Sequence, residues 1–232
     1  MNTKRMLLKL SGESFSDASS FISSKSLLRT VDEIKSAINN KNNVQLAIVV
    51  GAGNIWRGAG KFIERVTADK MGMLATIINA VALNSIFLKK KIKSRVFSSN
   101  LIDDFVEKFD IKKIQKSIEH GEIVIFAGGT GKPFFTTDTS AALMAAKIKA
   151  KILLKATQVN GIYNTDPKIN NGAIKFESLT FKEVIDKNLK IMDTEAFVLC
   201  MQKKISIVVF DFYKNGNLKK ILNGEKIGTT IV

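Results

Sequence analysis

The chain has very little of several residue types that build common active sites. Its 232 residues include one cysteine, one histidine, one tryptophan and two prolines. A single cysteine excludes an intrachain disulfide, and one cysteine with one histidine cannot form a Cys/His zinc site. A Ser-His-Asp triad would depend on His120, which lies at the predicted end of a helix. We therefore discount hydrolases of that type and predict no metal-ligating residues.

Long apolar runs are also scarce, since none reaches the roughly 18 residues that span a bilayer. Residues 1–10 contain only a short apolar stretch, which Lys9 interrupts, and they are typical of a first strand rather than a signal peptide. Cys200 lies in an apolar stretch, where we expect a buried thiol. Low cysteine usage favours a reducing compartment, so we expect a cytoplasmic protein with no membrane partner.

Basic residues outnumber acidic ones by 36 to 21, which gives a formal net charge of +15. An excess of this size is common in proteins that bind nucleic acids. The lysines are nevertheless scattered through every segment, without a basic tail or interleaved aromatic residues. We favour a lysine-rich surface and expect no specific nucleic-acid partner, although a positive field also attracts anionic substrates.

Short apolar runs alternate with helical spacings along the chain. Continuous runs of this length suit strands that are buried on both faces of a parallel sheet. The sequence therefore predicts an α/β fold with a mainly parallel sheet. Strands are expected at residues 6–8, 44–50, 94–98, 123–127, 152–154 and 205–210. Helices are expected at residues 27–38, 71–88, 111–118, 139–149, 181–188 and 194–203.

Two of these helices carry more detailed expectations. The helix at residues 71–88 is apolar on several faces, so we expect it to be deeply buried. Asp138 or Thr139 is expected to cap the alanine-rich helix at residues 139–149. The turn-rich stretch at residues 163–173 is expected to be a loop that marks a boundary between two lobes.

Four polar segments follow predicted strands, where ligands bind in open α/β sheets. Glycine lets backbone amides approach an anion, and lysine or arginine offsets its charge. Each segment alone is compatible with an ordinary turn, but together they favour an enzyme that binds phosphates. The segments are residues 9–12, 51–60, 128–138 and 155–167.

Individual residues in these segments sharpen that prediction. Lys9 places a charge at a strand end where an apolar residue would pack better. Arg57 can contact a phosphate with two N–H groups, although no Gly-Lys-Ser/Thr of a Walker A loop follows it. Tyr163 is suited to flank a purine, and Asp166 is suited to accept from a ribose, a base amine or a catalytic lysine.

Taken in order, these motifs resemble the amino acid kinase superfamily and, within it, the bacterial UMP kinases. The likeness extends over nearly the whole chain, and the segments at residues 69–76 and 133–138 separate UMP kinases from their relatives. The motifs are Lys9-Leu10-Ser11-Gly12-Glu13, Gly53-Asn54 with residues 57–60, Asp69 with residues 71–76, residues 130–131 with 133–138, and Lys155-Ala156-Thr157 with Asp166-Pro167.

The resemblance implies a three-layer α/β sandwich with a central, mainly parallel sheet. It implies one domain over residues 1–232, with a UMP-binding lobe that is mainly N-terminal and an ATP-binding lobe that is mainly C-terminal. The implied reaction is transfer of the γ-phosphoryl group from ATP to UMP, with Mg²⁺ bound to the nucleotide, in pyrimidine nucleotide biosynthesis. Two alternatives are another small-molecule kinase of the superfamily, acting on aspartate, glutamate or carbamate, and a UMP-sensing regulatory protein.

The resemblance also assigns roles to individual residues. Lys9, Arg57 and Asp138 are the implied catalytic residues, with Asp138 orienting Lys9. The implied ATP-binding residues are Lys9, Leu10, Ser11, Gly12, Gly53, Arg57, Thr157, Tyr163 and Asp166. The implied UMP-binding residues are Ala52, Asp69, Thr130, Gly131, Lys132, Pro133, Phe134, Phe135, Thr136 and Thr137.

Regulation and assembly follow from the same resemblance. It implies a homohexamer built from dimers and UTP inhibition through the UMP site. Residues 14–24 are short and lack glycine, where many relatives have a longer segment linked to GTP activation, so we expect weak or absent activation by GTP. Ala52 replaces a usual glycine, and Lys132 replaces a usual asparagine.

Overall fold

The computed structural model describes residues 4–38, 44–57, 62–99, 105–167, 169–170 and 172–232. The strands of its main sheet are β1 (Lys4–Leu10), β2 (Val44–Val50), β3 (Ser94–Ser98), β4 (Glu107–Lys108), β5 (Ile123–Ala127), β6 (Ile152–Thr157), β9 (Ser178–Leu179), β10 (Ser206–Asp211) and β11 (Thr229–Ile231). The helices are η1 (Gly12–Phe15), α1 (Ser24–Ala37), α2 (Arg65–Lys89), α3 (Ile111–Glu119), α4 (Thr137–Lys147), α5 (Phe181–Asp186), α6 (Thr194–Gln202) and α7 (Asn217–Leu222).

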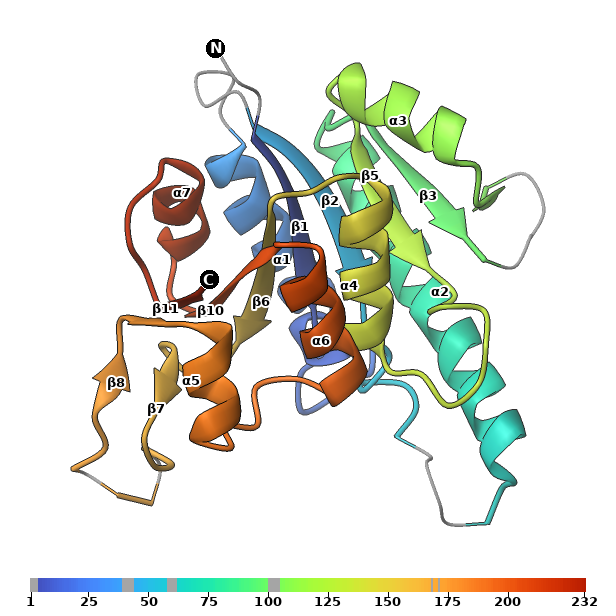
Figure 1. Ribbon diagram of the computed structural model, residues 1–232. Helices are drawn as coiled ribbons and strands as arrows, with labels where there is room; N and C mark the ends of the chain where they lie inside the picture. Colours follow the sequence, from blue (N-terminus) through green and yellow to red (C-terminus); the bar gives the residue numbers. More distant parts are fainter. Residues whose placement is uncertain (1–3, 39–43, 58–61, 100–104, 168, 171) are drawn as a thin grey trace.

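The strands form one sheet in the order β4-β3-β5-β2-β1-β6-β10-β11-β9 (Figure 1). Every neighbouring pair in it is parallel except β10 with β11. The predicted mainly parallel sheet is therefore confirmed. Two short strands, β7 (Ile162–Tyr163) and β8 (Lys175–Phe176), enclose the predicted turn-rich stretch, and they pair as a separate antiparallel hairpin that projects at one corner of the molecule (Figure 1).

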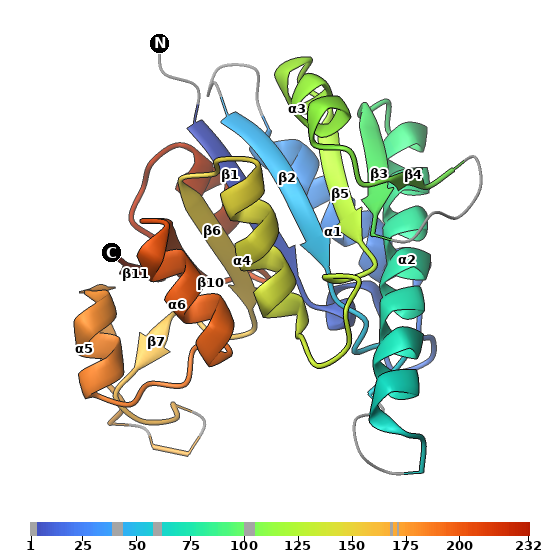
Figure 2. The same cartoon turned by 45° about the vertical axis from the view of Figure 1, so that its right-hand side comes forward.

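Helices cover both faces of the sheet and create two hydrophobic cores. Met6, Leu8 and Leu10 of β1 contribute to the core beneath α1, α2 and α7, whereas Leu7 contributes to the core beneath α3, α4 and α6. Successive side chains of a strand point to opposite faces, so one apolar run serves both cores. The result is a three-layer sandwich (Figure 2), as the resemblance implied.

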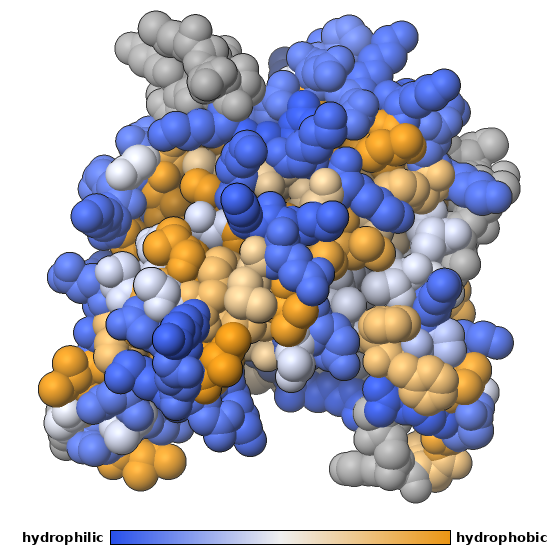
Figure 3. All heavy atoms as spheres, in the orientation of Figure 1, coloured by the Kyte–Doolittle hydropathy of each residue, from blue (hydrophilic) through white to orange (hydrophobic). Residues whose placement is uncertain are grey.

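The face that carries α4 and α6 has hydrophilic side chains spread over most of its outline (Figure 3). Hydrophobic side chains show between them in the middle of this face. Leu143, Ala146 and Leu199 are partly buried residues on these two helices. These two helices therefore cover the core but leave part of their own apolar side chains accessible to solvent.

The helix α2 differs from its prediction in length and in burial. It begins at Arg65 rather than residue 71, because the Glu64 carboxylate accepts from the first free backbone amides of the helix. Its length and composition would allow it to cross a membrane, yet it packs against β2, β3 and β5 as a core helix. The expected deep burial is wrong on one side, where Leu74 and Ile78 are each 50% exposed.

The cap predicted for α4 is also wrong. Thr136 caps this helix, because its Oγ1 accepts from the backbone amides of Asp138 and Thr139 at 3.0 and 3.2 Å. The Asp138 side chain turns instead towards the sheet. Spacing alone identifies a group of polar residues near a helix start, but it does not show which side chain folds back onto the backbone.

His120, which was discounted as a catalyst, and Cys200, which was expected to be buried, both occupy structural positions. His120 ends α3, with its Nδ1 2.8 Å from the Lys116 carbonyl oxygen. Cys200 is fully buried in α6, and burial raises the pKa of its thiol to about 12. The prediction of a buried thiol is confirmed.

Candidate functional site

The four polar segments are brought side by side by the order of the strands. They follow β1, β2, β5 and β6, which are neighbours in the order β5-β2-β1-β6. All four strands are parallel, so their carboxyl ends lie along one edge of the sheet. The segment after β5 and the segment after β6 are three strand spacings apart, or about 14 Å. Lys9 and the loop after β2 lie between them.

The ends of β1 and β2 approach one another too closely for a side chain at residue 12. The Gly51 amide donates to the Leu10 carbonyl oxygen at 2.8 Å. A Cβ atom placed on Gly12 would lie 2.2 Å from Asn54 Oδ1 and 2.6 Å from the Gly53 nitrogen. Glycine is therefore required here for contact between two loops, and the contact fixes the distance between them.

Three charged side chains meet at the centre of this edge. Lys9 Nζ lies 3.0 Å from Asp138 Oδ1, and Lys155 Nζ donates to Asp138 Oδ2. The lysines face one another on adjacent strands, because Lys9 of β1 pairs in register with Lys155 of β6. Asp138 reaches them from the first turn of α4. The cluster has a net charge of +1 and is largely withdrawn from solvent.

The electrostatics of this cluster leave positive charge available to a ligand. Burial by itself raises the pKa of Asp138, but the charges of Lys9 and Lys155 outweigh it and hold that pKa below the usual value. Burial lowers the pKa of Lys155, and Lys9 lowers it further, although Asp138 opposes both. Lys9 Nζ lies 3.0 Å from Asp138 Oδ1, and an ammonium group has three N–H donors, so Lys9 can hold this carboxylate and still donate to another acceptor.

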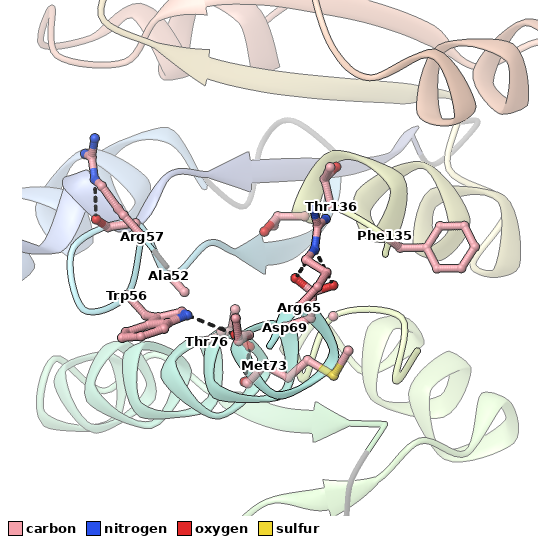
Figure 4. Close-up of a pocket in the computed structure, with 14 residues that line it drawn as sticks. Ala52, Trp56, Arg57, Arg65, Asp69, Met73, Thr76, Phe135 and Thr136 are labelled. Carbon is pink, nitrogen blue, oxygen red and sulfur yellow. Dashed lines mark hydrogen bonds and ion pairs between the residues drawn. The ribbon is translucent and has the colours of Figure 1, made fainter. Parts of the chain in front are cut away.

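One cavity of about 420 Å³ opens on the α2 side of the cluster. In Figure 4 the Trp56 ring lies beside α2, and Arg57 extends from the other side of the loop that carries Ala52. Trp56 Nε1 donates to the Ala68 carbonyl oxygen at 2.9 Å and ties the loop to the helix. The lining is formed by Ala52, Gly53, Trp56, Arg57, Arg65, Ala68, Asp69, Gly72, Met73, Thr76, Gly129, Phe135, Thr136 and Thr137.

Asp69 connects α2 to the loop after β5 at the edge of this cavity. Its Oδ2 accepts from the Phe134 amide at 2.7 Å, and Arg65 donates to the same carboxylate at 3.0 Å. Phe134 has a φ of 72°, an unusual value for a residue with a side chain. The Phe135 ring points away from the other labelled side chains in Figure 4. The carboxylate therefore holds this loop in a bent form at the edge of the cavity.

A second cavity of about 750 Å³ opens on the other side of the cluster, next to β6 and β7. Its volume is typical of sites for cofactors and nucleotides. Apolar and polar side chains alternate around it, which suits a flat base and a sugar. The lining is formed by Lys155, Thr157, Val159, Gly161, Ile162, Tyr163, Thr165, Asp166, Pro167, Asn188, Leu189, Lys190, Ile191 and Val209.

Asp193 joins the walls of the two cavities. It caps α6 by accepting from the Ala196 amide at 2.9 Å, and it also accepts from Thr139 Oγ1 at 2.8 Å and from Thr136 Oγ1. Thr136 lines the first cavity, and residues 188–191 just before α6 line the second. Asp193 therefore ties the start of α6 to the first turn of α4, which carries Asp138.

Arg57 makes its contacts with protein groups in this structure. Its Nε donates to the Gly53 carbonyl oxygen at 2.7 Å, and its NH2 group pairs with the Glu13 carboxylate. Gln158 reaches the same carboxylate from the loop after β6 at 3.4 Å. Arg57 is exposed, so it can exchange Glu13 for a phosphate at little cost in desolvation.

The structure brings together many, but not all, of the predicted site residues. Seven of the predicted residues line the first cavity, and Thr157, Tyr163 and Asp166 line the second. Leu10 is buried in the core, and Ser11 accepts from the Glu13 amide. Gly58 and Gly60 lie outside the described residues. The segment at residues 130–134 lies beside the first cavity without lining it, with Thr130 and Lys132 bonded to each other. Ala52 has no positive φ, so its Cβ is tolerated.

Sequence reasoning gave no role to several residues of the site. Lys155 interrupts an apolar strand just as Lys9 does, so the same signal identifies both. Trp56 and Asp193 had no comparable signal. Residues 188–191 connect two short helices, and they reach the second cavity only through the folding of α5 and α6.

Comparisons with known proteins agree with this geometry. The family model described as "Amino acid kinase family" matches residues 4–211. The chain is similar to the crystal structure of UMP kinase from Ureaplasma parvum, with 34% identity, a TM-score of 0.92 and coverage of 100% of this chain and 99% of that one. It is also similar to UMP kinase from Bacillus anthracis, with 35% identity, a TM-score of 0.93 and coverage of 98% and 95%.

A more distant structure shares the fold. Uridylate kinase from Archaeoglobus fulgidus is 24% identical, with a TM-score of 0.71 and coverage of 98% of this chain and 99% of that one. At this identity the likeness concerns the fold alone. The architecture is therefore retained where most of the sequence has changed.

Proposed function

Since the chain belongs to the amino acid kinase family, we propose that it transfers the γ-phosphoryl group of ATP to UMP, giving ADP and UDP. The observation that carries this proposal is the cluster of Lys9, Asp138 and Lys155, which lies between two cavities. The likeness to solved UMP kinases along the whole chain supports UMP as the acceptor.

In this proposal the second cavity takes the adenosine of ATP. Thr157, Tyr163 and Asp166 surround the base and ribose there, as the resemblance implies. Lys155 lines the same cavity, so the phosphates extend from it towards Lys9. Arg57 leaves Glu13 to hold phosphate oxygens.

UMP occupies the first cavity. Asp69 and the backbone at Ala52 hold its nucleoside, and the loop after β5 folds over it, with Thr136 and Thr137 in the wall. This assignment extends to the rest of the loop, residues 130–135, which closes around the ligand. The two nucleotides therefore approach the lysine cluster from opposite sides.

The reaction needs no general base. The second pKa of a phosphate monoester is about 6, so UMP is largely a dianion at neutral pH. One of its oxygens forms a bond to the γ-phosphorus, while the bond from that phosphorus to the β–γ bridging oxygen breaks and ADP leaves with the electron pair. Lys9, Lys155 and Arg57 offset the repulsion between the two anions, and Asp138 keeps both lysines in place.

Mg²⁺ is proposed to arrive with ATP. Among the described residues, no three His, Cys, Asp or Glu side chains lie close enough to hold a metal ion. Mg²⁺ often takes most of its ligands from substrate phosphates and water, so a site completed by ATP is compatible with these residues. When bound, the ion neutralises part of the phosphate charge.

The experiment that tests the function is a coupled assay of UDP formation. The purified protein is incubated with ATP, Mg²⁺ and UMP, and CMP, dUMP, aspartate, glutamate and carbamate are offered as other acceptors. We expect UMP to be the preferred acceptor by a wide margin. A preference for a carboxylate acceptor would assign the chain to another activity of the family, and binding of UMP without turnover would indicate a sensor.

The pH dependence of kcat/KM for ATP should show an alkaline limb that is due to Lys155. Its pKa lies below the ordinary lysine value, so its proton is lost as pH rises through that lowered pKa, and one positive charge disappears from the free enzyme. We expect kcat/KM to fall at a pH below 10.5, the ordinary value. Lys155→Arg keeps its charge, so the limb should move to higher pH or vanish. Circular dichroism over the same range is the control, and an unchanged limb in this variant would contradict the assignment.

We propose further that the protein is a cytoplasmic homohexamer, with UTP as an inhibitor at the UMP site, little effect of GTP and a role in pyrimidine nucleotide biosynthesis. The domain would span residues 1–232, with its UMP lobe mainly N-terminal. The exposed side of α2 supports self-association. Leu74, Ile78 and Leu88 are 50%, 50% and 55% exposed, and together with Val81 they lie along one helix face at successive spacings of four, three and seven residues.

Charge on this face should disrupt assembly. Ile78→Glu, alone or with Leu74→Glu, places a carboxylate in an apolar contact, and we expect a smaller species by sedimentation velocity. Ile185→Glu on α5 is the matched control, since Ile185 is 54% exposed and lies on another helix. Assembly of Ile78→Glu indistinguishable from that of the control would show that α2 is not an interface.

A further inference from the structure

Two buried asparagines, Asn54 and Asn79, form a reciprocal pair beneath the loop after β2. Asn79 Nδ2 donates to Asn54 Oδ1 at 2.7 Å, and Asn54 Nδ2 donates to Asn79 Oδ1 at 3.0 Å. Asn79 of α2 is fully buried, and Asn54 is 9% exposed. Side-chain amides are rarely buried to this extent, because each loses its hydrogen bonds to water.

The remaining hydrogen bonds of the pair reach two other segments. Asn79 Nδ2 donates to the Gly51 carbonyl oxygen at 2.8 Å, and Asn54 Nδ2 donates to the Phe21 carbonyl oxygen at 2.6 Å. Gly12 also fits against Asn54 Oδ1. The pair therefore joins α2, the loop after β2, the segment before α1 and the turn that follows Lys9.

This arrangement holds both ends of a short piece of backbone that lines the first cavity. Ala52 and Gly53 lie between Gly51 and Asn54, and Asn79 bonds to both of those flanking residues. The position of Ala52 and Gly53 relative to Lys9 is thus set by a side chain that contacts neither cavity.

We propose that Asn79 is a positioning residue for phosphoryl transfer. It acts through Asn54 and holds the Ala52-Gly53 backbone at a fixed position relative to Lys9. The inference rests on the proposed function. Two apolar side chains would fill the same space without the cost of burying two amides. An apolar pair would, however, lack the four hydrogen bonds that fix the position and orientation of the loop backbone.

The first test compares the turnover of two asparagine variants on the same helix. Asn79→Ala should lower kcat by about a hundredfold, the loss expected when reacting groups are displaced by about 1 Å. KM for UMP should change less than kcat, because Ala52 is only one of the groups assigned to UMP and Asp69, Thr136 and Thr137 remain in the wall. Asn84→Ala is the matched control, since Asn84 Oδ1 accepts from Ser94 Oγ at 2.7 Å at the far end of α2.

The pair should also behave as one unit. The double variant with alanine at positions 54 and 79 should lose no more kcat than Asn79→Ala alone, because residues in one hydrogen-bond network are not additive. Additive losses would mean that the two asparagines act separately and would overturn the proposal.

The second test does not depend on turnover. Trp56 is the only tryptophan of the chain and lies in the same loop, three residues after Gly53. Its emission should be quenched by acrylamide more readily in Asn79→Ala than in Asn84→Ala. If Asn79→Ala does not fold, Asn54→Asp replaces it, since aspartate still accepts from Asn79 but no longer donates to Phe21.

Each outcome bears on one of the two proposals. Quenching or kcat equal to that of the Asn84→Ala control would overturn the positioning role and leave a purely structural pair. If the wild-type protein formed no UDP, the proposed function would fail. The quenching of Trp56 would then still decide whether Asn79 positions the loop.

Discussion

Replacing Lys9 by alanine is expected to lower kcat by about a hundredfold or more, while the protein remains folded. Lys9 Nζ is one of two amines at the centre of the site, and its only ion pair among the described residues is with Asp138. Removing it leaves Lys155 to neutralise Asp138, so the cluster loses the net positive charge that two nucleotide anions require. UMP should still bind, because its cavity is lined by other residues.

The measurement is steady-state UDP formation, with UMP binding followed by the emission of Trp56. Lys90→Ala is the control, since Lys90 pairs with Asp32 at 2.9 Å on the surface. Turnover of Lys9→Ala close to that of the wild type would remove Lys9 from the mechanism.

Asp138→Asn should have the largest effect on stability. The variant leaves Lys9 and Lys155 facing one another without a counter-charge, and their side chains are 15% and 14% exposed. Breaking a buried ion pair in this way costs about 3 kcal/mol of the free energy of unfolding. Turnover should fall as well, because nothing then orients the two amines.

Urea unfolding at neutral pH measures this loss. Asp32→Asn is the matched control, because it breaks the surface pair with Lys90 and should cost less than about 1 kcal/mol. The sign of the pH effect follows from the lowered pKa of Asp138. Its stabilisation is present above the unfolded-state pKa of about 3.9 and disappears as pH falls through the lower folded pKa. Asp138→Asn should lack this acid loss, and an equal loss in both proteins would be evidence against the ion pair.

The fold and the ends of the strands were predictable from local patterns. Apolar runs such as residues 44–50 and 123–127 are short and continuous, and helical spacings separate them, which is enough to predict a parallel sheet. Since the four polar segments follow predicted strands, they were expected at the edge of the sheet where the carboxyl ends of the parallel strands lie. The short strands β4, β9 and β11 carry too few residues for any period to be recognised.

The order of the strands was not predictable in the same way. Chain order is β1, β2, β5, β6, whereas the sheet places them as β5-β2-β1-β6. That order decides which segments become neighbours, and it depends on contacts between residues that are far apart in the sequence. The contact of Lys155 with Asp138 and the joining of two cavity walls by Asp193 both depend on it.

The register of β1 against β6 has a consequence for how such a site can change. Lys9 and Lys155 are partners in this register. If β1 shifted by one residue against β6, the Lys9 side chain would point to the opposite face of the sheet, into the other core. The smallest shift that keeps Lys9 on the same face is two residues, or about 6.6 Å. The spacing of the two charges can therefore change only in large steps. The loops at the strand ends can change in sequence to bind another acceptor. The distance between the Lys9 and Lys155 amines, which the transferred phosphoryl group must fit, then stays the same.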